Sequence, residues 1–222
     1  MLAFERIETA GPIQQSVIWL HGLGADGNDF VPIVDRLSLT NTRYIFPHAP
    51  QRPVTLNHGY VMPAWFDIYG LAGNDKQDVE GMRSMSAQID LLIQNEIDAG
   101  IASERILLAG FSQGGAMASY CALQYPQRLA GLMMLSSYLP QKHTLLQQVS
   151  EANRHLPIFI THGLWDDIIP IASFREMLSI FSQSGFTPQA HEYEMAHSLC
   201  DEEIGDIDCF MRGIFYVADG VK

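Results

Sequence analysis

The chain has 222 residues and a formal net charge of -12 at pH 7, with 47% hydrophobic and 17% charged residues. This length and balance are typical of a folded α/β domain and not of a disordered chain. The negative charge argues against nucleic acids and anionic membranes, because both are bound through Lys and Arg. We therefore expect one soluble domain over residues 1–222.

Three cysteines without a CxxC pair, Cys121, Cys200 and Cys209, predict neither a disulfide framework nor a zinc site. The first eight residues are charged too early for a signal peptide. No apolar run approaches the roughly 18–20 residues that span a bilayer. We expect reduced thiols and a cytoplasmic protein.

Short apolar runs predict strands that are buried on both faces of a parallel sheet. They cover residues 17–20, 44–46, 106–109, 132–135 and 158–160, with an alternating run at 189–193 that suits an edge strand. Helical spacing and end signals predict helices over residues 82–97, 115–123, 174–181 and 202–217, the last with Asp201 as its N-cap. This alternation predicts an α/β fold with a doubly wound, mostly parallel sheet and helices on both faces. The segment from Pro47 to Lys76 is expected as a long loop, and loops of that length are usually functional.

The sequence Gly110-Phe111-Ser112-Gln113-Gly114 matches G-x-S-x-G between a predicted strand and a predicted helix. In this context the motif predicts a nucleophile elbow, a sharp turn that exposes the serine hydroxyl at the carboxyl edge of the sheet. The glycines are needed because larger side chains beside so tight a turn would collide. A serine that only caps the helix is the less favoured alternative.

A nucleophilic serine needs a base, and the base needs an orienting carboxylate. In this kind of fold they follow in the order Ser, Asp or Glu, His. Asp166 and Asp167 both follow the strand at 158–160, and spacing alone does not separate them. His197 follows the edge strand and precedes the last helix, which is where the base belongs; the other histidines lie elsewhere.

The tetrahedral intermediate of acyl transfer needs hydrogen-bond donors for its oxyanion. One donor is expected from the backbone N–H of Gln113, the residue after the nucleophile. The loop after the first predicted strand offers the second, and the backbone N–H of Leu23 is the candidate.

Residues 22–27 also fit G-x-G-x-x-G after a strand, which would indicate a nucleotide-binding domain. That fingerprint expects an acidic residue about 20 residues further on, and residues 43–48 contain none. A non-catalytic binding protein on a hydrolase scaffold is a third class. It is disfavoured because such proteins usually lose one of the three catalytic residues.

Taken together, these segments resemble the small carboxylesterases and acyl-protein thioesterases, a phospholipase/carboxylesterase family of α/β-hydrolases. The resemblance covers nearly the whole chain and is carried by residues 20–30, 47–57, 62–68, 110–115, 162–170 and 195–197. It implies the α/β-hydrolase fold without a large cap domain. It also implies that Asp166 is the triad acid, since the family pattern there is H-G-x-x-D-x-x-V-P, with Ile169 in place of the valine.

The resemblance implies a serine carboxylesterase that hydrolyses esters or thioesters through an acyl-enzyme, with lysophospholipase activity as the alternative. No cofactor or metal is expected. The expected partners are a small-molecule ester, a lysophospholipid or an acylated protein, without nucleic acid or stable membrane insertion, and a homodimer is left open. The candidate substrate-binding residues are apolar, and packing of their own loops is an equally good interpretation of each; they are Leu23, Met62, Trp65, Phe66, Leu71 and Trp165. Phe66 stands where the family often has tyrosine, and Trp165 is bulkier than many residues at its position.

Overall fold

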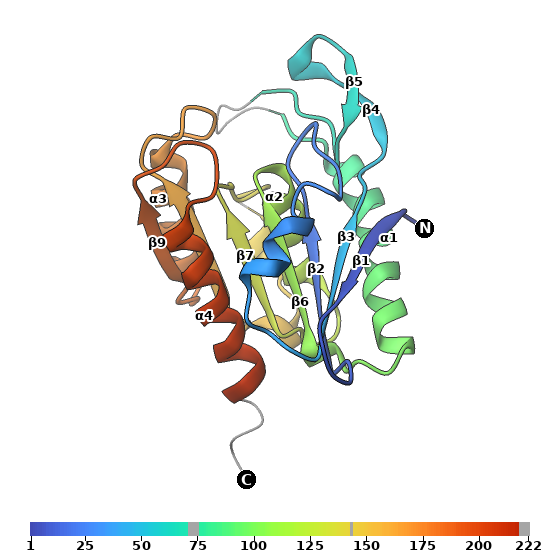
Figure 1. Ribbon diagram of the computed structural model, residues 1–222. Helices are drawn as coiled ribbons and strands as arrows, with labels where there is room; N and C mark the ends of the chain where they lie inside the picture. The colour runs from blue at the N-terminus through green and yellow to red at the C-terminus, as the bar shows by residue number, and fades with distance from the viewer. Residues whose placement is uncertain (71–75, 143, 218–222) are drawn as a thin grey trace.

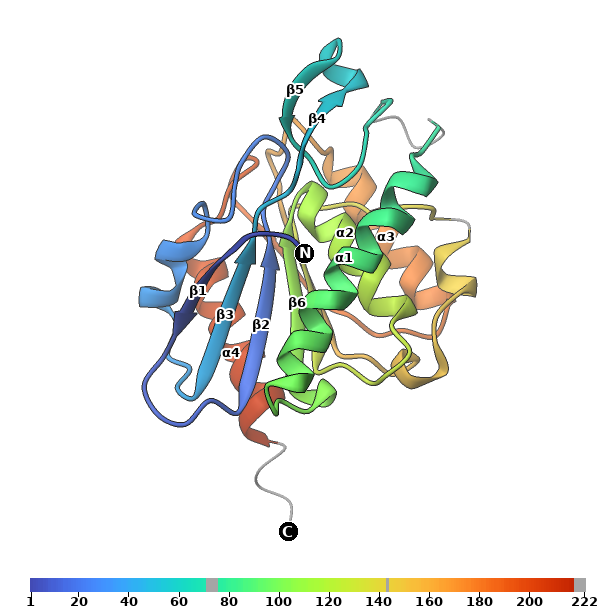
Figure 2. The same ribbon diagram turned by 90° about the vertical axis from the view of Figure 1, so that its right-hand side faces the viewer.

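The computed structural model describes residues 1–70, 76–142 and 144–217. Its centre is a seven-stranded sheet in the order β1-β3-β2-β6-β7-β8-β9 (Figures 1 and 2). The strands are β1 (Phe4–Glu8), β2 (Gln15–Leu20), β3 (Thr42–Pro47), β6 (Ile106–Phe111), β7 (Gly131–Leu135), β8 (Ile158–Gly163) and β9 (Gln189–Tyr193). Every neighbouring pair is parallel except β1 with β3. The predicted mostly parallel sheet is confirmed.

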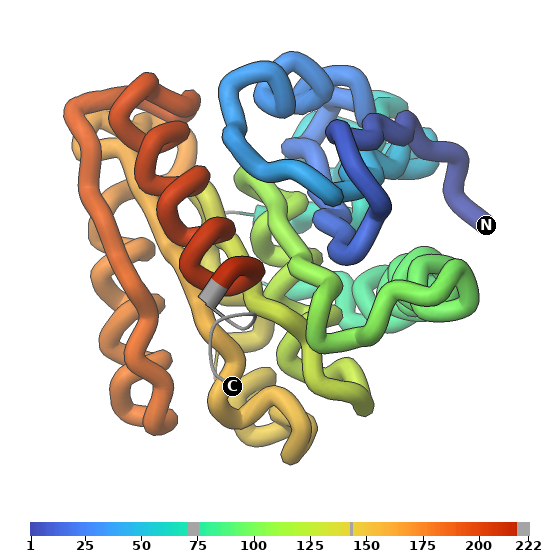
Figure 3. Tube along the Cα trace, turned by 60° about the horizontal axis from the view of Figure 1, so that its bottom comes forward, coloured from blue at the N-terminus to red at the C-terminus, as the bar shows by residue number. Residues whose placement is uncertain are grey.

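Helices cover both faces of this sheet, as predicted (Figures 2 and 3). One face carries α1 (Val79–Asp98), α2 (Gln113–Gln124) and α3 (Ile171–Gln183), and the other carries α4 (Asp201–Val217) and the 3-10 turn Val31–Arg36. Successive residues of a strand point to opposite faces, so Ile18 packs into the first apolar layer and Trp19 into the second. Among the described helices, none has both the length and the hydropathy that crossing a bilayer requires.

Local signals explain where the helices begin and end. The Asp78 side chain accepts a hydrogen bond from the Gly81 N–H at the start of α1 (2.9 Å). Gly100 follows the end of that helix with φ +96°, the left-handed conformation that favours glycine. Asp201, predicted as an N-cap, is instead the first residue of α4, in an acidic first turn that complements the helix dipole.

Two parts of the structure differ from the sequence prediction. The antiparallel edge strand β1 is absent from the prediction because its side chains are only half-buried or exposed, so it has no apolar run. The segment expected as a long loop contains a hairpin, β4 (Gln51–Val54) and β5 (Tyr60–Pro63), whose turn has positive φ at His58 and Gly59. This hairpin projects beyond the carboxyl ends of the parallel strands (Figures 1 and 2). The expectation of a continuous loop was therefore wrong there.

Candidate active site

Ser112 lies at the tight turn between β6 and α2, with φ +54° and ψ −122°. A Cβ atom on Gly110 would come within 2.3 Å of the Gly114 backbone, and one on Gly114 within 2.2 Å of the Leu20 carbonyl oxygen. Both glycines are therefore required by close backbone contacts. The turn has the strained strand-to-helix geometry of a nucleophile elbow.

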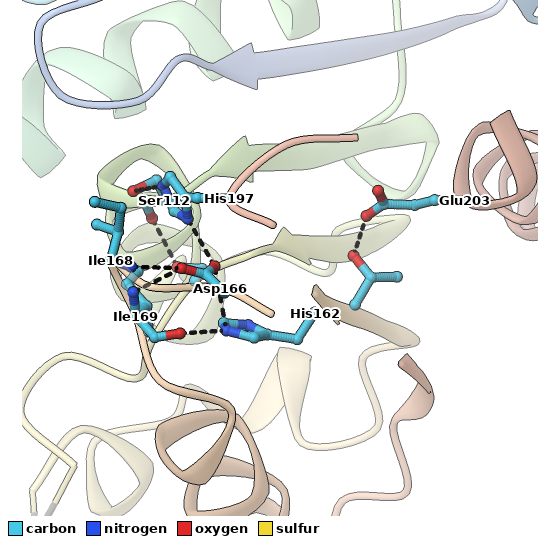
Figure 4. Close-up of polar contacts among 9 residues, drawn as sticks. Ser112, His162, Asp166, Ile168, Ile169, His197 and Glu203 are labelled. Atoms are coloured by element: carbon cyan, nitrogen blue, oxygen red, sulfur yellow. Dashed lines mark hydrogen bonds and ion pairs between the residues drawn. The ribbon is translucent and has the colours of Figure 1, made fainter. Parts of the chain in front are cut away.

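Three side chains from separate parts of the chain form one hydrogen-bonded series (Figure 4). The Ser112 Oγ lies 3.0 Å from Nε2 of His197, and the Nδ1 of His197 lies 2.7 Å from Oδ2 of Asp166. A carboxylate only accepts, so Nδ1 carries the proton and Nε2 presents a lone pair to the serine hydroxyl. The His197 ring also packs against Phe111, with 4.8 Å between ring centroids.

The loop after β8 directs Asp166 toward His197 and leaves Asp167 exposed to solvent. The other oxygen of Asp166, Oδ1, accepts hydrogen bonds from the backbone N–H groups of Ile168 (2.9 Å) and Ile169 (2.8 Å). Asp166 is buried, whereas Asp167 is exposed. The structure therefore brings the first of the two aspartates to His197.

His162, at the end of β8, supports the same loop. Its Nε2 lies 2.7 Å from the Ile169 carbonyl oxygen and 3.4 Å from Oδ2 of Asp166. Burial lowers the pKa of His162, so the ring stays neutral and Nε2 donates its proton to the carbonyl. Sequence reasoning placed this residue outside the site because it precedes the aspartates.

The loop after β2 passes directly beside the elbow. A Cβ on Gly22 would lie 3.5 Å from Cβ of Ser112. Within the described residues, the backbone N–H groups of Leu23 and Gln113 donate to no protein acceptor. Both amides are therefore without a protein partner in the described part of the chain, and the Gln113 amide directly follows Ser112 in the sequence.

The predicted substrate-binding residues differ in their exposure. Trp165 is 63% exposed and Met62 is partly buried, so both present surface to solvent. Phe66 is nearly buried and lines a cavity of about 90 Å³ together with Ile168 and Ile169 of the Asp166 loop. Leu71 lies outside the described residues.

Trp65, in contrast, is fully buried. Its Nε1 donates to the His21 carbonyl oxygen (2.8 Å), and its backbone N–H donates to Oε1 of Gln113 (3.0 Å). Nε2 of Gln113 in turn donates to the Phe66 carbonyl oxygen (2.7 Å). Trp65 therefore ties the hairpin segment to the elbow and has no surface with which to contact a substrate.

Glu203 in the first turn of α4 is a second buried carboxyl group near β8 (Figure 4). Its Oε1 accepts a hydrogen bond from the Thr161 hydroxyl, and its Oε2 has no partner among the described residues. Burial raises the pKa of Glu203 to about 7. No sequence signal identified this residue, because nothing in a helix's first turn shows which acid faces the sheet.

Known proteins provide an independent line of comparison. The phospholipase/carboxylesterase family model matches residues 3–214. Acyl-protein thioesterase 1 of Cryptococcus neoformans var. neoformans serotype D is 36% identical over 215 residues, which cover 88% of this chain and 90% of that protein. Acyl-protein thioesterase 1 of Gibberella zeae is 36% identical over 209 residues, which cover 89% of each.

Solved structures show the same relationship. Acyl-protein thioesterase 2 of Zea mays superposes with a TM-score of 0.88 at 27% identity, covering 96% of this chain and 99% of that one. The chain therefore belongs to the phospholipase/carboxylesterase family of α/β-hydrolases, and it is a serine hydrolase that acts on ester bonds.

Proposed function

We propose that Ser112, His197 and Asp166 form the catalytic triad of an acyl-protein thioesterase-like hydrolase. The observation that carries this proposal is the unbroken series of hydrogen bonds from Ser112 Oγ through the imidazole to the Asp166 carboxylate, at 3.0 and 2.7 Å. The order of the three residues along the chain is also that of α/β-hydrolases.

The proposed reaction has two steps. His197 takes the Ser112 proton as Oγ attacks the substrate carbonyl, and then protonates the leaving thiol or alcohol. Water, deprotonated by His197, next attacks the acyl-enzyme; the carboxylic acid is released as His197 returns the proton to Ser112 Oγ. Asp166 stays ionised and keeps the imidazole in the tautomer that accepts at Nε2. In both steps the N–H groups of Leu23 and Gln113 bind the oxyanion.

The proposed substrate is an acylated protein or a smaller ester or thioester that carries an apolar acyl chain. Two relatives that are 36% identical are named as acyl-protein thioesterases. The cavity adjoining the Asp166 loop has apolar lining from Phe66, Ile168 and Ile169 and charged lining from Asp67, Lys142 and Glu176, so the proposed acyl chain rests on the relatives and not on this cavity. We place the activity in the cytoplasm, consistent with the three free cysteines. A homodimer stays a prediction.

The test begins with Ser112→Ala. We expect it to lower the turnover of p-nitrophenyl butyrate by at least about 10⁴-fold and to abolish labelling by a fluorophosphonate probe. Ser119→Ala is the matched control: Ser119 is also buried, but its hydroxyl donates only within α2, to the Ala116 carbonyl oxygen. Activity of Ser112→Ala within tenfold of the wild type would refute the assignment.

The substrate class is tested with a series of acyl thioesters, oxygen esters and lysophospholipids of increasing chain length. For a thioesterase we expect kcat/KM to be highest for long-chain acyl thioesters on a cysteine peptide. Preference for a lysophospholipid over that peptide would favour the alternative activity.

A further inference from the structure

Each of the two proposed oxyanion donors belongs to a peptide group whose carbonyl oxygen is hydrogen-bonded to a buried side chain. The Leu23 N–H belongs to the peptide plane of the Gly22 carbonyl, and the Gln113 N–H to that of the Ser112 carbonyl. A trans peptide is planar, with N–H and C=O pointing in opposite directions, and the described chain contains no cis peptide. A side chain that holds either carbonyl therefore sets the direction of the N–H on the opposite side.

His21 holds the first of these carbonyls. The residue is 1% exposed. Its Nε2 lies 3.0 Å from the backbone nitrogen of Ala49, and its Nδ1 lies 2.7 Å from the Gly22 carbonyl oxygen. The Ala49 N–H can only donate, so Nε2 is the acceptor, and Nδ1 carries the proton and donates to the Gly22 carbonyl.

Neighbouring groups fix the His21 ring and main chain in this arrangement. Trp65 packs beside the ring at 4.9 Å between centroids and donates its Nε1–H to the His21 carbonyl. Protonation of the ring would remove the lone pair that accepts from Ala49. Burial lowers the pKa of His21, which keeps the ring neutral.

Ser137 holds the second carbonyl. Its hydroxyl lies on the loop after β7, is fully buried, and donates to the Ser112 carbonyl oxygen at 2.7 Å. The same oxygen accepts the backbone N–H groups of Gly115 (3.0 Å) and Ala116 (3.2 Å) at the start of α2. A Cβ on Gly115 would lie 2.7 Å from the Ser137 Oγ, so glycine is what permits this approach.

We propose that His21 and Ser137 are positioning residues that orient the two oxyanion-hole amides from behind. The inference rests on the proposed function, since it takes Leu23 and Gln113 as the donors. Each bond holds a peptide plane before the substrate arrives, so little reorganisation is needed when the oxyanion forms. Each bond also polarises its peptide, because a carbonyl that accepts a hydrogen bond makes the N–H of that peptide a stronger donor.

Two substitutions at His21 distinguish a role in orienting the Gly22 peptide from a role in packing of the buried ring. Asparagine carries its amide nitrogen on Cγ, as histidine carries Nδ1, so His21→Asn retains a donor for the Gly22 carbonyl and loses the acceptor for Ala49. Glutamine extends one bond further, so His21→Gln retains the acceptor and loses that donor. Ser137→Ala removes the other donor by deleting one oxygen atom, and Ser119→Ala is its control.

Each variant is assayed for kcat and KM with p-nitrophenyl butyrate and for inhibition by an alkyl trifluoromethyl ketone, whose adduct with Ser112 presents an oxyanion. Active enzyme is counted by fluorophosphonate titration. We expect His21→Gln and Ser137→Ala to lower kcat by about 10–100-fold, less than the loss of a whole donor. We also expect KM to change less than threefold and the inhibition constant to rise by about the same factor as kcat falls. His21→Asn and Ser119→Ala are expected to stay within fivefold of the wild type.

The outcomes separate this inference from the proposed function. A purely structural role would reduce the fraction of active enzyme and leave kcat per active site and the inhibition constant unchanged, which would overturn the inference. Equal losses in His21→Asn and His21→Gln would overturn it for His21, and wild-type inhibition of Ser137→Ala would overturn it for Ser137. If the His21 variants do not fold, Ser137→Ala decides the inference alone. An active Ser112→Ala enzyme would instead refute the triad itself.

Discussion

Asp166 and Glu203 are both buried carboxyl groups beside β8, but their surroundings differ in the number of hydrogen-bond donors (Figure 4). Asp166 lies on a loop and accepts from two backbone N–H groups and the His197 imidazole. Glu203 lies on a packed helix, where the Thr161 hydroxyl donates to Oε1 and the Cys200 backbone also faces the carboxyl group, while Oε2 has no partner among the described residues. Asp166 therefore has more hydrogen-bond donors than Glu203, because the His197 imidazole adds to two backbone amides.

We therefore assign the two groups different proposed roles, Asp166 in catalysis and Glu203 in stability. Hydrogen bonds to a carboxylate favour its charged form, which is what a base-orienting residue requires. Burial raises the pKa of Glu203 to about 7, and the hydrogen bonds from the Thr161 hydroxyl and the Cys200 backbone offset this rise only in part. The two sites therefore predict different responses to removal of the charge.

The largest expected effect is on catalysis, from Asp166→Asn. The substitution keeps the shape of the side chain but no longer fixes the His197 tautomer, so we expect kcat to fall by about 10⁴-fold. Asp167→Asn is the matched control, since Asp167 is the exposed neighbour and has no hydrogen bond or ion pair with His197 among the described residues. Steady-state kinetics with p-nitrophenyl butyrate measure both variants. Equal losses in the two would remove the distinction between a buried and an exposed aspartate.

The second prediction concerns the pH dependence of stability and Glu203→Gln. The raised pKa of Glu203 means that the folded protein holds a proton which the unfolded chain releases at its ordinary pKa of 4.5. The resulting stabilisation is fully present below pH 4.5 and is lost as the pH rises to about 7, at about 1.4 kcal/mol per pH unit. We expect the free energy of unfolding of the wild type relative to Glu203→Gln to fall at this rate between pH 5 and 7.

Urea unfolding at several pH values measures this difference directly. His21 and His162 contribute with the opposite sign, because their lowered pKa values make the folded protein lose stability as the pH falls below 6.5. Both histidines are present in the wild type and in the variant, so their effect cancels in the comparison. A difference that is independent of pH would show that Glu203 titrates alike in the folded and unfolded states.

The elbow and the parallel sheet are the features that the sequence predicts well, because each depends on local pattern. The glycines of G-x-S-x-G indicate close backbone contacts at Gly110 and Gly114, and these contacts arise within the turn and its immediate neighbours. The G-x-G-x-x-G pattern at 22–27 shows the limit of such motifs. No α-helix follows it directly, and the next element is the 3-10 turn Val31–Arg36, so it lacks the helix N-terminus on which a nucleotide phosphate would bind.

The features that the sequence does not predict depend on contacts between distant segments. Ser137 meets the Ser112 carbonyl only because β7 pairs with β6 in a given register. Trp65 is a large aromatic residue of the kind that often contacts substrates. It is nevertheless fully buried, because the hairpin folds back on the elbow. The strands of the β4–β5 hairpin have four residues each, with Pro53 inside β4 and Pro63 at the end of β5, so no alternation indicates them. Tertiary packing rather than residue type decides each of these.

The smallest expected effect is a stability gain from Gly205→Ala, two residues after Glu203 on α4. Gly205 is exposed within the helix, and a Cβ atom there would meet no other atom within 4 Å. Alanine restricts the unfolded chain and favours the helix, so we expect up to about 1 kcal/mol of added stability. This substitution changes no titrating group, so urea unfolding should show the same gain at pH 5 and pH 8. A gain that varies with pH would mean that any change in the stability of α4 alters the pH dependence of unfolding, even without a change in a titrating group. The slope seen in Glu203→Gln would then no longer be evidence for a proton on that carboxyl group.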